Sequence, residues 1–194
     1  MNSSRINARL LKEIQNQKNI TVHQLHKEYD DFKIDVPREQ KLLVEHENIV
    51  LQFPFCWYST PALLKQWLDN VLSHGFSHGK GGDKLHGKKL QLAISTAYSV
   101  KHYNPIMFKT HPKLEPLQDL PTPYLKSSIA IENEKDTMGA LLKPLEQTAY
   151  YIGMDYQKPF IIHSASPLGQ NSHAISEEEL DKRAKEYLDL INSL

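Results

Sequence analysis

Short apolar runs alternate with amphipathic stretches along most of this chain. Strands are predicted at residues 49–53, 90–95 and 160–163, with a further short strand at 20–25. Between them, apolar residues recur at the spacing of a helix with one buried face. The predicted helices lie at residues 6–14, 37–46, 61–72 and 141–152, and a last one follows Ser176. This alternation predicts an α/β fold in which helices cover both faces of a parallel sheet.

Polar residues mark the starts of these helices. Ser3 or Ser4 can cap the first helix and Asp35 the second, because their side chains accept hydrogen bonds from free amides. Ser176 opens the last helix as part of a capping box with Glu179. The caps therefore support the helix boundaries that the apolar spacing indicates.

The most informative stretch is the loop that follows the strand at 49–53. Pro54 ends this strand, and Pro61 begins an amphipathic helix. Three aromatic rings stand between them at the carboxyl end of a strand, which is where open α/β sheets bind their ligands. A flat cofactor is therefore expected here, with an aromatic corner of the core as the alternative. The loop residues are Phe55, Cys56, Trp57, Tyr58, Ser59 and Thr60.

Residues 96–137 carry no periodic pattern. This segment contains five prolines and is far longer than an ordinary loop of about 4–6 residues. Loops of this length are usually functional, so a lid over a binding site is one expectation for it.

Length and composition limit the class of protein. The 194 residues, 40% of them hydrophobic, fit a single domain over residues 1–194. Lys plus Arg and Asp plus Glu both number 23, so no positive surplus attracts nucleic acid or an anionic membrane. No apolar run approaches the roughly 20 residues that span a bilayer, and a single cysteine excludes a disulfide framework. We therefore expect a cytoplasmic protein without membrane insertion.

Two isolated features point only weakly to chemistry. His74, His78 and His86 lie in a glycine-rich segment without a nearby acidic cluster, so a metal site is not expected. Cys56 has no activating base in the sequence and is interpreted as a small apolar side chain rather than a nucleophile.

Three segments together resemble a known family: QFPFCWYSTPALLKQWLDNVLSHGFSHGKGG, DKLHGKKLQLAISTA and LLKPLEQTAYYIGM. They contain a Phe-Pro-x-x-Trp-Tyr loop, a Pro-x-Leu-Leu-Lys helix and a His-Gly-x-x-x-Gly-x-Gly-Gly turn. This combination is similar to the flavodoxin-like NAD(P)H:quinone oxidoreductases, which include DT-diaphorase, general stress proteins and ancillary subunits of bacterial potassium-efflux systems. The resemblance covers most of the chain apart from the long loop, and it implies a doubly wound, flavodoxin-like parallel sheet.

The resemblance implies a flavin at the carboxyl edge of this sheet. Ser4, Ile6 and Asn7 match the positions that hold the flavin phosphate in the family, and amides at a helix N-terminus suit an anion. A plain helix cap is the alternative interpretation of this segment. The flavin ring would be held by two loops, namely by Pro54, Phe55, Cys56, Trp57, Tyr58, Ser95, Thr96, Ala97 and Tyr98.

Two side chains match catalytic positions of DT-diaphorase relatives. Tyr103 lies where these relatives place a tyrosine that stabilises charge on the reduced flavin, and His111 is the candidate for the accompanying histidine. His102 competes with His111, because an insertion in the long loop leaves the alignment ambiguous. The resemblance thus implies Tyr103 and His111 as catalytic residues.

The chain departs from the family pattern in two places. The family usually reads Thr-Gly-Gly where residues 96–98 read Thr-Ala-Tyr, whose side chains can crowd or cover the flavin edge. Relatives also carry an apolar strand before the phosphate loop, and this chain starts inside that loop. We therefore expect the first, central strand of the 2-1-3-4-5 order to be missing, and the natural protein to carry about ten more residues.

The expected activity is NAD(P)H-dependent reduction of quinones or similar acceptors. Hydride would pass from NAD(P)H to the flavin and then to the acceptor in a ping-pong scheme, within a homodimer. FMN is expected rather than FAD. The main alternative is a flavin-binding regulatory subunit docked peripherally on a potassium-efflux transporter, and a third is an inactive domain without flavin. The choice between NADH and NADPH stays open.

Overall fold

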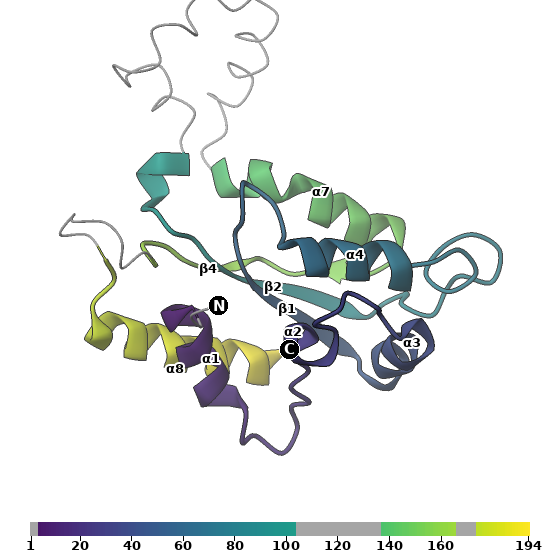
Figure 1. The fold of residues 1–194 in the computed structure, drawn as a ribbon, viewed down its shortest axis with the longest axis horizontal. Coiled ribbons are helices and arrows are strands. Elements are labelled where there is room, and N and C mark those ends of the chain that lie inside the picture. Colours follow the sequence, from purple (N-terminus) through teal and green to yellow (C-terminus); the bar gives the residue numbers. More distant parts are fainter. Residues whose placement is uncertain (1–3, 104–136, 166–173) are drawn as a thin grey trace, which may run out of the picture.

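The computed structural model describes residues 4–103, 137–165 and 174–194. The strands are β1 (Asn48–Pro54), β2 (Lys89–Ser95), β3 (Asp155–Tyr156) and β4 (Phe160–Ile162). The helices are α1 (Arg5–Ile14), α2 (Leu25–Glu28), α3 (Val36–Glu45), α4 (Ala62–Val71), α7 (Thr137–Tyr151) and α8 (Glu177–Ser193), with a 3-10 turn η1 (Val100–Tyr103). Helices α4 and α7 cover one face of the sheet, and α1 and α8 cover the other (Figure 1). This arrangement confirms the predicted α/β architecture.

Strand β2 is the centre of the sheet. It pairs in parallel with β1 along one edge. Its other edge pairs in parallel with β3 at Lys89 and Leu90, and with β4 from Ala93 to Ser95. Because all pairings are parallel, the carboxyl ends of β1, β2 and β4 lie at the same edge of the sheet. The loops that follow these strands therefore meet there.

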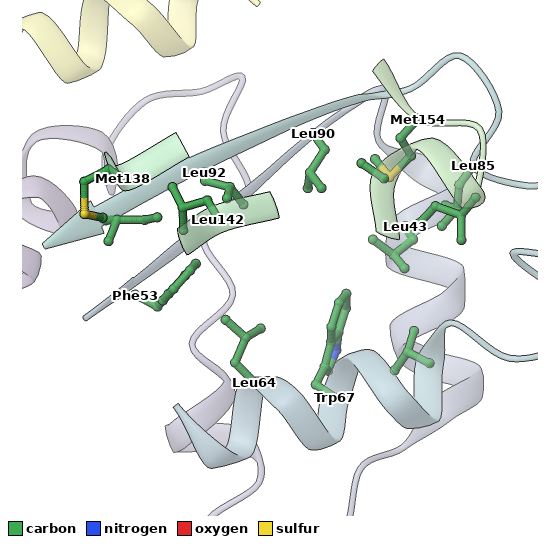
Figure 2. Close-up of a cluster of buried hydrophobic side chains, with 14 of the residues drawn as sticks. Leu43, Phe53, Leu64, Trp67, Leu85, Leu90, Leu92, Met138, Leu142 and Met154 are labelled. Carbon is green, nitrogen blue, oxygen red and sulfur yellow. The ribbon is translucent and has the colours of Figure 1, made fainter. Parts of the chain in front are cut away.

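The larger core fills the space between the sheet and helices α4 and α7. Figure 2 shows Leu64 and Trp67 of α4 pointing toward the strands, with Phe53 of β1 and Leu92 of β2 in the same cluster. Leu142 brings α7 into this cluster. The helical spacing of apolar residues in α4 thus buries one face of the helix, as predicted.

A second core fixes helices α1 and α8 on the opposite face. Ile6 and Leu10 of α1 and Tyr187 of α8 are all buried there. The hydroxyl of Tyr187 donates to Oε1 of Gln52 on β1 at 3.0 Å, and its ring lies 5.4 Å from that of Phe160. This packing holds α1 against the sheet near the carboxyl edge of β1.

The predicted strand at residues 20–25 was wrong. Residues 20–24 have no regular structure, and α2 begins at Leu25. Ile20 and Val22 are partly buried against the second core, so their alternation serves packing rather than pairing. A ladder needs a strand about 4.8 Å away, and among the described residues β1 pairs only with β2.

The other predicted elements are confirmed within one to four residues at their ends. Ser4, Asp35 and Ser176 are the N-caps of α1, α3 and α8, and each accepts a hydrogen bond from a first-turn amide. Strand β3 was not predicted, because its two residues are too short to carry a pattern. None of the helices that the structure describes has the length and apolar character needed to cross a bilayer.

Candidate functional site

Asn7 joins three segments at the carboxyl edge of the sheet. Its side-chain amide donates to Oγ of Ser95 at 2.9 Å and to Oγ of Ser4 at 3.2 Å. Its carbonyl accepts a hydrogen bond from Nε2 of Gln52 at 3.0 Å. The start of α1 is therefore tied to the ends of both β1 and β2, which places the predicted phosphate segment beside the predicted flavin loops.

The first turn of α1 is built as a helix N-terminus facing this edge. Oγ of Ser4 accepts from the Asn7 amide at 3.5 Å, as a capping side chain does. Ile6 is fully buried in the second core, so only its backbone is placed to meet a ligand. Arg5 donates to Glu177 and to the carbonyl of Ile175, which ties this turn to the start of α8.

Residues 56–59 form a tight turn, here called the aromatic turn. Cys56 and Ser59 exchange two backbone hydrogen bonds of 2.9 Å. The two residues between them, Trp57 and Tyr58, both have positive φ, at 48° and 61°, as in the type I′ turn that usually favours Asn and Gly. Such backbone conformations cost about 1–3 kcal/mol each in non-glycine residues and cluster at functional sites. The sequence predicted a loop here without indicating its backbone conformation. The positive φ of both residues is therefore visible only in the structure.

The aromatic turn presents free backbone donors and one fully exposed ring. Phe55 N–H donates to the carbonyl of Ser95 at 2.8 Å, which fixes the base of the turn on β2. Within the described residues, the amides of Trp57 and Tyr58 have no backbone partner. The side chain of Trp57 is 94% exposed. Cys56 is exposed on the turn, so it does not fill the core as a small apolar side chain. Desolvation of its thiol raises the pKa of Cys56, which disfavours the reactive thiolate.

Tyr103 connects the aromatic loop to the last strand. Its ring is buried and lies 6.1 Å from Phe55, 6.2 Å from Tyr58 and 5.9 Å from His163, measured between ring centroids. The structure thus brings Tyr103 to the candidate site, although its ring packs between loops rather than lying open. Residues 104–136, which carry His111 and most of the expected lid, lie outside the described residues, as does the side chain of His102.

The loop after β2 is anchored through Thr96, with two exposed residues following it. Thr96 is fully buried, and its N–H donates to the carbonyl of Ile162 at 2.9 Å. Ala97 and Tyr98 are exposed at the same edge. Of the three side chains that were expected to crowd the flavin edge, only those of Ala97 and Tyr98 are therefore exposed there.

His163 is a site residue that the sequence interpretation did not single out. It follows β4 directly, and its Nδ1 lies 2.8 Å from Oγ1 of Thr96. Burial, and then the charge of Arg183, lowers the pKa of His163. The sequence did offer one signal for His163, namely its position at the carboxyl end of a predicted parallel strand. Ligands bind at this edge of open α/β sheets.

A groove of about 350 Å³ lies between α4 and α7 beside the aromatic turn. Phe55, Tyr58 and Leu145 contribute to its mostly apolar wall. Oγ1 of Thr60 is buried at this wall, where none of the residues that the structure describes offers it a hydrogen bond. The groove therefore has the volume and lining of a site for a small apolar ligand with a polar edge.

The histidines of the glycine-rich segment pack against aromatic rings. The ring of His78 lies 5.8 Å from that of His74 and 5.4 Å from that of Tyr151. Across residues 4–103, 137–165 and 174–194, no group of three or more His, Cys, Asp or Glu is arranged to hold a metal ion.

Curated relatives match nearly the whole chain. An uncharacterized NAD(P)H oxidoreductase, YrkL of Bacillus subtilis, is 38% identical over 93% of this chain and 89% of its own length. The glutathione-regulated potassium-efflux system ancillary protein KefG of an Enterobacter species is 39% identical over 85% of this chain and 78% of its own length.

Solved structures show the same fold. General stress protein 14 of Treponema denticola, in complex with FMN, superposes with a TM-score of 0.73 at 30% identity, covering 98% of this chain and 91% of its own. An NADPH-quinone reductase of P. pentosaceus superposes with a TM-score of 0.67 at 25% identity, covering 97% and 89%. A chain titled thermophilic tryptophan halogenase, from Streptomycin violaceusniger, superposes with a TM-score of 0.76 at 29% identity, covering 98% and 92%.

The family model for the flavodoxin-like fold matches residues 1–117, which include α1, the aromatic turn and the loop after β2. This match spans more than half of the chain, and the curated relatives extend it over nearly all of the rest. The chain therefore belongs to the flavodoxin-like fold family.

Proposed function

We propose that this chain binds FMN and oxidises NAD(P)H with a quinone or a similar acceptor. The observation that carries the proposal is the meeting of the α1 N-terminus, the aromatic turn and the loop after β2 at one edge of the sheet. The relatives support it, since their names include NAD(P)H oxidoreductase and NADPH-quinone reductase. FMN is proposed rather than FAD because a similar general stress protein 14 was solved with FMN.

The donor groups at this edge fit a phosphorylated flavin. Ser4, the Ile6 amide and Asn7 would hold the phosphate, because the N-terminus of α1 carries free donors and positive dipole charge. The unpartnered amides of Trp57 and Tyr58 would donate to the polar edge of the ring, together with groups of the loop formed by residues 95–98. When bound, FMN supplies two-electron hydride chemistry between NAD(P)H and the acceptor.

The residues beside the groove would position the two substrates. Phe55 and Tyr58 offer flat apolar surface at its wall, and Trp57 is exposed on the same aromatic turn. We propose that the nicotinamide and the acceptor occupy the same place in turn, which is a ping-pong order. Tyr103 and His111 are proposed to stabilise negative charge at the site.

Reconstitution with FMN tests the proposal. The purified chain is incubated with FMN, separated from free cofactor by gel filtration, and examined for flavin absorbance at about 450 nm. Retained FMN, and NADPH or NADH oxidation that depends on an added quinone, are the expected results. A protein that retains no FMN and oxidises neither nucleotide would contradict the proposal.

A homodimer in the cytoplasm is proposed as the working form. The aromatic side chains of Tyr150, 55% exposed, and Tyr151, 72% exposed, lie on α7 and offer an apolar surface for a second copy, and Tyr151 also lines the groove. Light scattering should give a mass twice the 22.4 kDa of the chain. A mass of one chain at micromolar concentration would contradict this part.

A regulatory role beside a potassium-efflux transporter is the second candidate. The 39% identity to KefG over 85% of this chain favours it. In that case the protein should sediment with membrane vesicles that contain the transporter and stay in solution with vesicles that lack it. Equal behaviour with both vesicle types would exclude this candidate.

A further inference from the structure

The groove between α4 and α7 is long and narrow. Its lining residues run along α7 from Leu141 to Tyr151, which is about 15 Å at about 1.5 Å per residue. On the facing side they run along α4 from Lys65 to Leu72, just past the end of that helix. A volume of about 350 Å³ spread over this length leaves a mean cross-section of about 23 Å². This cross-section is close to that of one extended hydrocarbon chain.

Both helices lead away from the edge of the sheet where the cofactor is proposed to bind. Helix α4 begins shortly after the aromatic turn, and α7 ends just before β3, which pairs with the first residues of β2 (Figure 1). The groove therefore has an aromatic end, at Phe55 and Tyr58, and a far end, at Leu72 and Ile152. A ligand that fills it must be elongated.

The walls between these two ends are aliphatic and only partly buried. They include four leucines that pack against the larger core and keep part of their surface exposed, namely Leu68, Leu72, Leu141 and Leu145. Pro144 also lines the groove, and its ring adds apolar surface without a backbone N–H. An apolar ligand would remove this surface from water, which favours its binding.

Several polar groups of the groove already have partners within the fold. Oγ1 of Thr148 donates to the carbonyl of Pro144 at 2.8 Å. Nζ of Lys65 and Oδ1 of Asp69 pair at 2.5 Å, and both side chains are more than half exposed, so they lie at the open side. Because these two charges compensate each other, the open side suits an uncharged ligand. The buried hydroxyl of Thr60 lies next to the aromatic turn, which places a polar group at the aromatic end.

A small cavity of about 20 Å³ adjoins the far end of the groove. The residues that line both spaces are Leu68, Leu72, Leu145, Thr148 and Ile152. Trp67 lines the cavity and is not part of the groove. Apolar cavities in proteins stay dry and accept hydrocarbon. The far end of the groove is therefore suited to the end of an apolar chain.

We propose that the acceptor of this protein is a quinone that carries a hydrocarbon side chain, and that the groove between α4 and α7 binds this chain. The quinone ring would lie at Phe55 and Tyr58, with the chain extending toward Leu72 and Ile152. This inference rests on the proposed function and names the class of its acceptor. The groove contributes binding energy away from the reacting ring, so it favours substituted quinones over bare ones.

Binding of redox-inert analogues tests the groove apart from any catalysis. The probes are 1,4-dimethoxybenzenes with straight alkyl chains of increasing length, and calorimetry measures their Kd for the full chain with and without FMN. Each added methylene should tighten binding about two- to fourfold until the groove is full. Equal Kd values for short and long chains would overturn the inference. An n-alkanol of the same length should compete more weakly, and equal competition would indicate a lipid chain rather than a ring-bearing acceptor and would also overturn it.

Substitutions of Leu145 test the wall, because this side chain lines both the groove and the cavity. Leu145→Asn should remove most of the dependence of Kd on chain length, whereas Leu145→Met keeps apolar volume and should retain it. The matched control is Leu11→Asn, since Leu11 is partly buried on α1 and does not line the groove. The same chain-length dependence in all three variants would overturn the inference.

Fluorescence quenching locates the end of the bound chain. The protein has two tryptophans, so in a Trp57→Phe background the emission comes from Trp67 beside the cavity. At saturation, a probe with bromine at the end of its alkyl chain should quench Trp67, and a probe with bromine on its ring should not. No quenching by the first probe, or equal quenching by both, would overturn the proposed orientation.

Kinetics and light scattering separate this inference from the proposed function. With the FMN-loaded protein, KM for alkylquinones should fall with chain length by the same factor per methylene, and a constant KM would overturn the acceptor class alone. A protein that retains no FMN would overturn the proposed function and the acceptor class together, while the binding assays still decide whether the groove takes a hydrocarbon chain. A dimer that excludes the probes would show that a second copy fills the groove, which would overturn the inference but not the proposed function.

Discussion

The side-chain amide of Asn7 donates to Oγ of Ser95 at 2.9 Å, which joins the first turn of α1 to the end of β2 across 88 positions of sequence. A second bond from the same amide reaches Oγ of Ser4 at 3.2 Å. Both partners stand at the edge where the flavin is proposed to bind. The side-chain amide of Asn7 therefore helps to align the phosphate segment with the flavin loops.

Replacing Asn7 by Ala should weaken FMN binding about 2- to 150-fold, because one or two hydrogen bonds of about 0.5–1.5 kcal/mol each are lost. Quenching of FMN fluorescence in a titration measures the dissociation constant. Asn16→Ala is the matched control, since Asn16 is exposed just after α1. Equal FMN affinity in both variants would show that Asn7 has no part in the site.

Glu39→Gln should destabilise the fold by about 2–4 kcal/mol, because a buried carboxylate would lose acceptor capacity toward several donors. Glu39 is 1% exposed and accepts from Tyr29 Oη at 2.5 Å and Trp67 Nε1 at 2.7 Å, with His23 Nε2 at 2.9 Å. An amide presents a donor where these groups need an acceptor. Urea unfolding followed by tryptophan fluorescence measures the loss.

The control for this substitution is Glu45→Gln on the same helix, where the side chain is 50% exposed. We expect it to change the free energy of unfolding by less than about 0.5 kcal/mol. A loss in Glu39→Gln no larger than in the control would contradict the importance of the buried network.

Tyr29 should make the protein less stable in alkali. Burial, and then the hydrogen bond to Glu39, raises the pKa of Tyr29 to about 12, whereas an unfolded tyrosine titrates near about pH 10. The folded protein then keeps a proton that the unfolded chain loses. The contribution to stability is fully present below about pH 10 and is lost as the pH rises toward 12.

Tyr29→Phe should therefore flatten the fall in the free energy of unfolding between about pH 10 and about pH 12. Part of the fall should remain, because burial also raises the pKa of Tyr187. Tyr151→Phe, at a 72% exposed side chain, is the control and should keep the full slope. The same slope in both variants would exclude Tyr29 as the source.

Gly153→Ala should cost more stability than Gly81→Ala, although both positions have positive φ, at 73° and 79°. A Cβ at position 153 would lie 2.3 Å from Cδ2 of His86, while position 81 has no atom within 4 Å. Strain at positive φ costs about 1 kcal/mol in both variants. Overpacking should add about 1–3 kcal/mol at position 153 alone. Thermal unfolding of the two variants measures the difference, and equal values would contradict the steric contact.

The local elements of the fold could be predicted from sequence because their signals are local. Apolar spacing identified α4 and β1, and polar side chains identified the caps Ser4, Asp35 and Ser176. The prediction failed at residues 20–25, where a strand-like pattern has no partner strand in the part of the chain that the structure describes. Pairing is a property of two segments, so one segment cannot decide it.

The candidate site was predicted in part. The aromatic loop after β1 and the Asn7 segment lie at one edge, as the order of strands and the family resemblance implied. His163 was missed because its contact with Thr96 joins two residues that are 67 positions apart in the sequence. The positive φ of Trp57 and Tyr58 was also missed, since aromatic residues do not favour that conformation.

The sequence by itself determined the α/β class, the helix caps and the aromatic loop, because spacing and short-range hydrogen bonding act within one segment. The tertiary structure decided which polar groups meet. It buried Glu39 among Tyr29, Trp67 and His23, and it brought Nδ1 of His163 within hydrogen-bond distance of Oγ1 of Thr96. Such contacts depend on distances between segments that only packing of the whole chain fixes.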